Sequence, residues 1–233
     1  IAFMDLSETQ RIDNTHWSVA GGATLPANKS NTLYDEVTGI SGVRDVQLVN
    51  ELLASRYSGF GINGGEDYEK IESARRLDPS EYTVNNSLGF ISLNSSLNPD
   101  EVLAVAYEYS FGGQVYQVGE FSTDIDAPNA LVLKLLKSTT QSPELASWNL
   151  MMKNVYSIGA SQMQQEGFEM NVMYQNDSVG TRLQYLPASA ISNKLLLRVM
   201  NLDRLDSRNK VNPDGKFDYV EGYTALSSTG RII

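Results

Sequence analysis

The segment with the richest chemistry is Lys210–Glu221, which overlays the twelve-residue template of calcium-binding loops. The oxygen-bearing side chains that fall at ligand positions of the template are Asn212, Asp214, Asp218 and Glu221. Gly215 falls at the sharp turn, but Lys210 takes the first position, where the template needs a carboxylate. Two interpretations stay open: a calcium site at these four residues, or a Pro-Asp-Gly turn that precedes a strand at 217–223.

No complete catalytic set is visible in the chain. There is no cysteine, a single histidine (His16), and no Gly-x-Ser-x-Gly motif, so a thiolate nucleophile and a multi-histidine metal site are both excluded. The glycines of 57–65 match neither common nucleotide-binding spacing, which favours an ordinary loop. We therefore expect a protein that is not an enzyme and holds no cofactor, with calcium as the one candidate ion.

Composition narrows the class of partner. The 233 residues carry a formal net charge of −10, which argues against binding to nucleic acid, because phosphate contacts need clustered Lys and Arg. No run of about 18 apolar residues is present, so we expect no membrane-spanning helix. The chain begins at Ile1 without a signal peptide and ends on a strand-like Gly230–Ile233, which favours a fragment of a longer protein.

The strongest structural pattern is a long β-hairpin at about 101–121. Bulky residues alternate with smaller ones up to Phe111, and Gly112-Gly113 suit a tight turn that needs positive φ angles. A two-residue loop places Tyr109 opposite Tyr116. It also places Tyr107 opposite Val118 and Ala106 opposite Gly119. One face of the hairpin is then rich in tyrosine.

Two helices are expected after the hairpin. The spacing of leucines predicts one at about 129–137, and Ser142-Pro143 marks the start of another at about 143–157. Strands and helices therefore occur in separate blocks, which predicts an α+β fold: an antiparallel sheet with the long hairpin, packed against the two helices. We expect two parts: a polar N-terminal part at 1–77, which could form a small subdomain, and an α+β domain at 78–233.

Several runs together resemble one family. They are LNPDEVLAVAYEYSFGGQVYQVGEFS from Leu97, ALVLKLLKS from Ala130, WNLMMKNVYSIGA from Trp148 and NLDRLDSRNKVNPDGKFDYVEGYT from Asn201, with the ending Gly230–Ile233. In this order they resemble the SprA/Sov family of Bacteroidota, very large outer-membrane proteins of the type IX secretion system and of gliding motility. The resemblance covers about 78–233.

The resemblance implies a translocon component without catalytic residues. The parent protein would close into a large β-barrel in the outer membrane, and this chain would be a soluble domain on its extracellular or periplasmic side. Its work would be gating, bracing the barrel, or contact with other type IX components, such as a PorV-type protein, and with secreted cargo. The alternative is a stand-alone cell-surface module that binds carbohydrate or peptide on the aromatic hairpin face.

Overall fold

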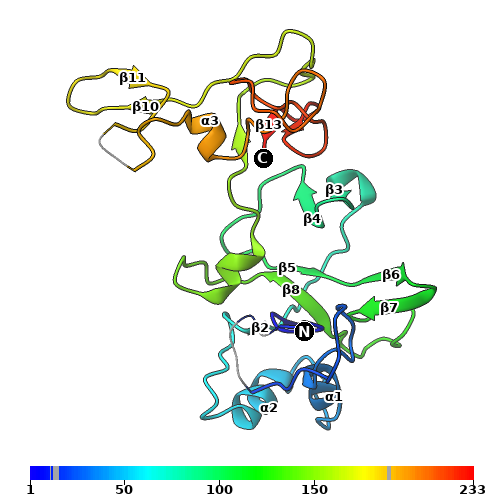
Figure 1. Cartoon of the computed structure of the whole chain (residues 1–233). Helices are drawn as coiled ribbons and strands as arrows, with labels where there is room; N and C mark the ends of the chain where they lie inside the picture. Colours follow the sequence, from blue (N-terminus) through cyan, green and yellow to red (C-terminus); the bar gives the residue numbers. More distant parts are fainter. Residues whose placement is uncertain (11, 13–15, 188–189) are drawn as a thin grey trace. The chain divides into compact units, whose positions relative to one another are not determined.

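The structure is a computed structural model that describes residues 1–10, 12, 16–187 and 190–233 (Figure 1). It divides into two compact units. Unit 1 comprises Ile1–Thr83 and Ile91–Met152, and unit 2 comprises Val84–Phe90 and Lys153–Ile233. Strands in several small sheets outnumber the few helices, so the α+β prediction holds at this level. The division into 1–77 and 78–233 stays a prediction.

Unit 1 is built around a four-stranded sheet with the order β2-β1-β8-β5. Its strands are β1 (Ala2–Phe3), β2 (Tyr68–Glu69), β5 (Leu103–Val105) and β8 (Leu133–Lys137). β1 runs parallel to β8, and the other pairs are antiparallel. The sheet is therefore mixed. The predicted antiparallel arrangement is wrong for the pair β1 and β8, whose residues lie far apart in sequence.

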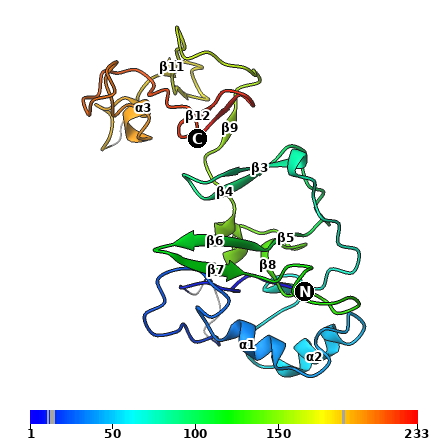
Figure 2. The ribbon, with the colours of Figure 1, turned by 90° about the vertical axis from the view of Figure 1, so that its right-hand side faces the viewer.

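Both faces of this sheet are buried. Phe3 belongs to an apolar cluster with residues of helices α1 (Leu33–Thr38) and α2 (Val49–Arg56). Its neighbour Ala2 belongs to a second cluster, which includes partly buried residues of the 3-10 helix Ala146–Leu150. Successive strand residues point to opposite faces, which explains why adjacent residues join different clusters. Figure 2 shows the two helices together beside the sheet.

The prediction of a helix at 129–137 is wrong, since this segment contains the strand β8. Leu135 packs in one apolar cluster and Val132 in the other. Lys134, which lies between these two residues in the sequence, is also buried. A strand that is covered on both faces reads as a continuous apolar run, so its period of two is hidden.

The prediction of a helix at 143–157 is also wrong, because the helix that forms is much shorter. Ser142 starts a turn and not a helix: its Oγ accepts a hydrogen bond from the Glu144 N–H at 3.2 Å, but the residue before the first helical position is Leu145. Only the short 3-10 helix Ala146–Leu150 follows, and Met152 and Val155 are exposed. A helix gains most of its stability by packing an apolar stripe, and the second half of this stripe is left exposed to solvent. The predicted packing of the sheet against two helices at 129–137 and 143–157 is therefore wrong for the described residues, and residues of α1, α2 and the 3-10 helix Ala146–Leu150 join the clusters on its faces instead.

Two hairpins complete the first part of the chain. The first joins β3 (Tyr82–Asn85) to β4 (Phe90–Leu93). The 3-10 helix Pro79–Glu81 precedes it, and Asp78 caps that helix. The second joins β6 (Tyr107–Phe111) to β7 (Gln114–Val118). It is shorter than the predicted 101–121, because β5 separates from it and pairs with β8.

Unit 2 consists of short elements. They are β9 (Tyr156–Ser157), β10 (Tyr174–Gln175), β11 (Arg182–Leu183), α3 (Leu196–Val199), β12 (Ala225–Leu226) and β13 (Arg231–Ile232). β13 lies between β12 and β9, and β10 pairs with β11. The core gathers Leu197, Leu202, Phe217, Ala225 and Ile232. In the described part of the chain, no helix has the length and apolarity that a membrane crossing requires.

Candidate interaction surface on the β6–β7 hairpin

The turn of the hairpin follows directly from its two glycines. Gly112 and Gly113 have φ angles of 60° and 79°, the left-handed conformation that a two-residue primed turn needs at both central positions. Tyr109 lies opposite Tyr116 and Tyr107 opposite Val118. The predicted register is therefore confirmed at these two pairs.

The root of the hairpin is fixed by backbone contacts. Gly119 has a φ of 73°, and a Cβ placed there would lie 3.1 Å from the Ala106 Cβ, so only glycine fits this close approach. The Asn28 side chain accepts from the Gly119 N–H at 2.7 Å and donates to the Gly119 carbonyl at 3.0 Å. The Val118 side chain is buried beside it. These contacts hold the root while the turn extends away from it.

A buried ion pair lies directly after the root. Glu120 is only 2% exposed and binds Arg44 through two hydrogen bonds, of 2.7 and 2.8 Å. Its two oxygens also accept from the Tyr34 hydroxyl and from the Val132 N–H, each at 2.8 Å. Burial alone would raise the pKa of Glu120, but these donors outweigh burial and lower its pKa. All four lone-pair sites of the carboxylate are occupied, which makes the cluster a structural brace.

The same cluster acts on Tyr34. Burial, together with its hydrogen bond to Glu120, raises the pKa of Tyr34 to about 12. The phenol therefore stays protonated and donates a hydrogen bond to Glu120 at every physiological pH. The alternation of the hairpin predicted its strands, but it did not single out Glu120 or Arg44. The sequence signal that points to Glu120 is an acidic residue directly after the buried end of a strand.

One face of the hairpin carries the aromatic residues, and we call it the aromatic face. Its members are Tyr107, Tyr109, Phe111 and Tyr116. The rings of Tyr109 and Tyr116 stack with centroids 5.3 Å apart, and Tyr107 lies 6.1 Å from Tyr109. Phe111 is 62% exposed and Tyr107 39% exposed. The face therefore presents apolar surface to solvent.

The two outer edges of the hairpin differ. On β7, the Gln117 carbonyl accepts a hydrogen bond of 2.9 Å from the Asn28 N–H, so another part of the chain covers this edge. The backbone N–H and carbonyl groups of Gln117 therefore point away from β6. In an antiparallel pair, residues that bond to each other alternate with residues whose backbone groups face outward, so the groups of its partner Glu108 point away from β7. The pair Ser110 and Val115, two positions on, has the same orientation. In the described part of the chain, the outer β6 edge has no strand beside it.

The residues of the predicted calcium site lie in unit 2 and have other partners. Asp218 accepts from the Arg204 N–H at 2.6 Å and from the Leu205 N–H at 3.0 Å. The Glu221 side chain accepts from the Ser227 N–H at 3.0 Å, and Asp214 accepts from the Lys216 N–H at 3.0 Å. Asn212 is exposed.

Within the described residues, no group of three or more histidine, aspartate or glutamate side chains is arranged to hold a metal. The calcium site stays a prediction. The strand expected at 217–223 is not formed, since Phe217 turns into the apolar core and the chain continues in a turn.

The carboxylate that organises this region is Asp203, which lies outside the twelve residues of the calcium-loop template. Asp203 is fully buried and accepts from the Asp214 N–H at 3.0 Å and the Gly215 N–H at 3.1 Å. Its other oxygen pairs with the Arg198 guanidinium at 3.2 Å. These bonds fix the Pro-Asp-Gly turn, because its backbone donors meet a charged acceptor.

His16 lies among aromatic rings in unit 1. Its ring centroid is 4.3 Å from that of Phe60 and 5.5 Å from that of Tyr57, and its Nε2 lies 3.2 Å from a Glu36 carboxylate oxygen. This arrangement explains the residue as part of a packed aromatic cluster. The sequence offered no signal for these contacts, because the partners are 20 and more residues away.

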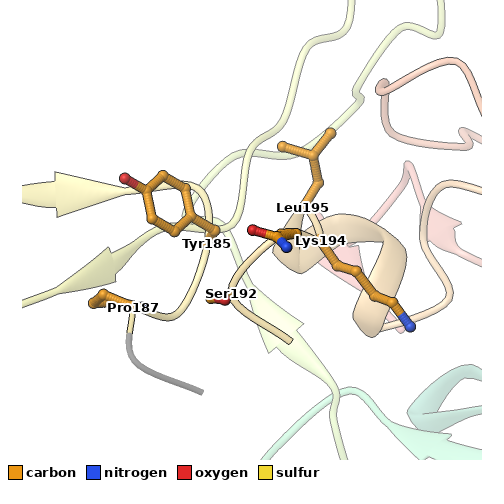
Figure 3. Close-up of a pocket in the computed structure, with 6 residues that line it drawn as sticks. Tyr185, Pro187, Ser192, Lys194 and Leu195 are labelled. Atoms are coloured by element: carbon orange, nitrogen blue, oxygen red, sulfur yellow. The ribbon is translucent and has the colours of Figure 1, made fainter. Parts of the chain in front are cut away.

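An open depression of about 480 Å³ lies in unit 2. Tyr185, Pro187, Ser192, Asn193, Lys194 and Leu195 line it (Figure 3). The hydroxyl of Tyr185 and the amino group of Lys194 point in different directions in this view. A small-molecule site needs polar groups that converge on one point, which this depression does not offer.

Comparisons with known proteins add no family to this description. No protein-family model matches the chain, and a search of curated proteins finds no match. The β6–β7 hairpin is therefore the candidate functional surface on geometry alone.

Proposed function

We propose that the chain is a non-enzymatic domain of an outer-membrane protein translocon of the SprA/Sov kind, which serves type IX secretion and gliding motility. Its role is to contact other secretion components or the secreted cargo. The sequence runs that begin at Leu97, Ala130, Trp148 and Asn201 support the family. The single observation that carries the contact role is the β6–β7 hairpin, which is braced at its root and apolar at its exposed turn.

The hairpin suits contact with a protein for a physical reason. Protein interfaces are enriched in aromatic residues, and a large exposed aromatic side chain contributes most when a partner desolvates it. Phe111 is the most exposed aromatic residue of the aromatic face. The bonds of Asn28 to Gly119 and the packing of Val118 keep the strands in place, so a partner meets a preorganised surface.

The test is a pair of substitutions in the full-length protein in its own bacterium. Phe111→Thr removes the exposed ring, and Val115→Thr serves as the matched control, because Val115 is equally exposed at 62% but points to the opposite face. Loss of an aromatic anchor weakens a contact by roughly tenfold. We expect Phe111→Thr to reduce the cargo proteins with C-terminal secretion signals in the medium, at unchanged levels of the protein in the outer membrane.

Two results would count against this proposal. Normal secretion in the Phe111→Thr strain would remove the role of the hairpin in transport. Equal losses in both strains would show that the substitutions act through folding and not through the aromatic face.

The second candidate is a cell-surface module that binds carbohydrate on the aromatic face. The specific observation in its favour is the stacked pair Tyr109 and Tyr116, with Tyr107 beside it, because rows of aromatic rings stack on sugar rings. Affinity electrophoresis in gels that contain soluble polysaccharide tests it. Tyr107→Ala should abolish the retardation of the chain, and a chain that migrates equally with and without polysaccharide would eliminate this candidate.

A further inference from the structure

We propose that the outer edge of β6 binds an extended segment of a partner protein, which adds to the hairpin as a third strand. This inference rests on the proposed role in partner contact and names the mode of that contact. The partner segment carries alternating side chains, with a basic residue opposite Glu108. The occupant follows from three features of the edge: its backbone, its two faces and its charge.

The backbone of β6 requires a strand. Glu108 and Ser110 direct their N–H and carbonyl groups away from β7, and no hydrogen bond to these groups is found within the described residues. Four backbone groups are thus available to an incoming strand over the five residues of β6. Strand addition to an exposed edge is an established mode of peptide recognition, and main-chain hydrogen bonds supply its affinity. The β7 edge is less suited, because Asn28 already binds Gln117 there.

The two faces of β6 define the side chains of the partner. Tyr107, Tyr109 and Phe111 point to one face, and Glu108 and Ser110 point to the other. Neighbouring strands place their side chains in register on each face, so alternate residues of the partner lie beside the aromatic row. Aromatic and β-branched residues pair best with such a row. The intervening residues of the partner meet a carboxylate and a hydroxyl.

Charge selects against a second copy of the chain. Glu108 is exposed, and the chain has a net charge of −10. Pairing of two β6 edges around Glu108 would place like charges side by side, which destabilises a strand pair. A lysine or arginine of a different protein at this position gains a favourable cross-strand pair instead. The charge thus protects the edge from its own copies and favours a basic partner.

The probe is the synthetic peptide Thr-Val-Lys-Tyr-Thr-Val-Lys-Tyr, labelled with fluorescein and titrated with the whole chain by fluorescence anisotropy. Ser110→Pro removes an outward N–H that the hairpin itself does not use, and proline is tolerated at such edge positions. Val115→Pro is the matched control, since it makes the same change opposite Ser110 on the other edge. We expect Ser110→Pro to weaken binding by at least about tenfold and Val115→Pro by less than about twofold.

A charge exchange keeps the test independent of folding. The same peptide with Glu in place of each Lys should bind the chain several-fold more weakly, and Glu108→Lys should reverse that preference. A reversal supports direct pairing at Glu108, whereas an unchanged preference would overturn the proposed register.

The remaining outcomes overturn the edge site in ways that can be told apart. No peptide binding, or equal weakening by both proline variants, removes the site. Weakening by Phe111→Thr but not by Ser110→Pro assigns the contact to the aromatic face, which leaves the proposed function standing without strand addition. Self-association of the chain that Ser110→Pro abolishes would assign the edge to a second copy. Peptide binding with normal secretion in the Phe111→Thr strain would support the edge and contradict the transport role.

Discussion

Replacing Glu120 by glutamine should destabilise unit 1 by about 3 kcal/mol. The carboxylate accepts four hydrogen bonds, two from Arg44 and one each from Tyr34 and the Val132 N–H. A glutamine oxygen accepts only two, and its amide group must then face donors. Tyr34 can rotate its hydroxyl to accept from the amide, but the Arg44 guanidinium cannot accept a hydrogen bond.

The magnitude follows from the groups that lose their partner. Breaking a buried ion pair costs about 3–5 kcal/mol when a charge remains without compensation. Arg44 is 23% exposed on its side chain, so water recovers part of its solvation and the lower end of this range applies. In a chain of 233 residues, about 3 kcal/mol corresponds to a fall in Tm of about 6–12 °C.

Urea unfolding followed by tryptophan fluorescence measures this change selectively. The two tryptophans, Trp17 and Trp148, both lie in unit 1, so their emission reports that unit. The midpoint should shift while the slope with denaturant stays constant. Glu72→Gln is the control, because Glu72 makes an exposed ion pair with Lys70 and should leave the midpoint unchanged. A loss below about 1 kcal/mol in Glu120→Gln would refute the assignment of the cluster as a brace.

Because the pKa of Glu120 lies below its ordinary value, the stabilisation is complete above about pH 4.5 and is lost as the pH falls through the lowered pKa, so acid titration of tryptophan fluorescence should show a flatter curve for Glu120→Gln. Asp203→Asn should destabilise unit 2 by about 2 kcal/mol and speed hydrogen exchange of the Asp214 amide; unchanged exchange would refute its role as an anchor. Gly119→Ala should lower the free energy of unfolding in thermal melts by about 2 kcal/mol and Gly113→Ala by about 1 kcal/mol, because of these two glycines only Gly119 faces a close neighbour. Equal losses would contradict the close packing at Gly119. If the 210–221 loop holds calcium, millimolar calcium raises the Tm and Asp214→Ala abolishes the rise, while equal melting with and without calcium excludes the site.

The hairpin could be predicted because its determinants are local. Gly112 and Gly113 specify the turn, and the alternation beside them specifies which residues face each other, so the pair Tyr109 and Tyr116 followed without knowledge of the rest of the chain. The exposure of the aromatic face and the availability of the β6 edge did not follow. Both depend on what packs nearby, which the alternation of a strand does not encode.

The errors share a physical origin. β8 was expected to be a helix because its leucines fit a helical stripe, yet its partners Ala2 and Ala104 lie in segments distant in sequence. The segment that begins at Ser142 has the residue types of a helix start, but Ser142 begins a turn, and only the short 3-10 helix Ala146–Leu150 forms after it. Glu120 was missed because Arg44, its partner, is 76 residues away. Tertiary partners decided each case, and local patterns contain no information about them.

The pairing of β1 with β8 also constrains how unit 1 can fold as the chain is made. Ala2 pairs with Leu133, so the first strand has no parallel partner until more than a hundred further residues have been synthesised. At about 5–20 residues per second, this interval lasts roughly 6–26 s. Phe3 and Met4, which end in the core, stay uncovered by β8 throughout it. A nascent chain of this topology therefore exposes apolar residues to aggregation until its sheet can close.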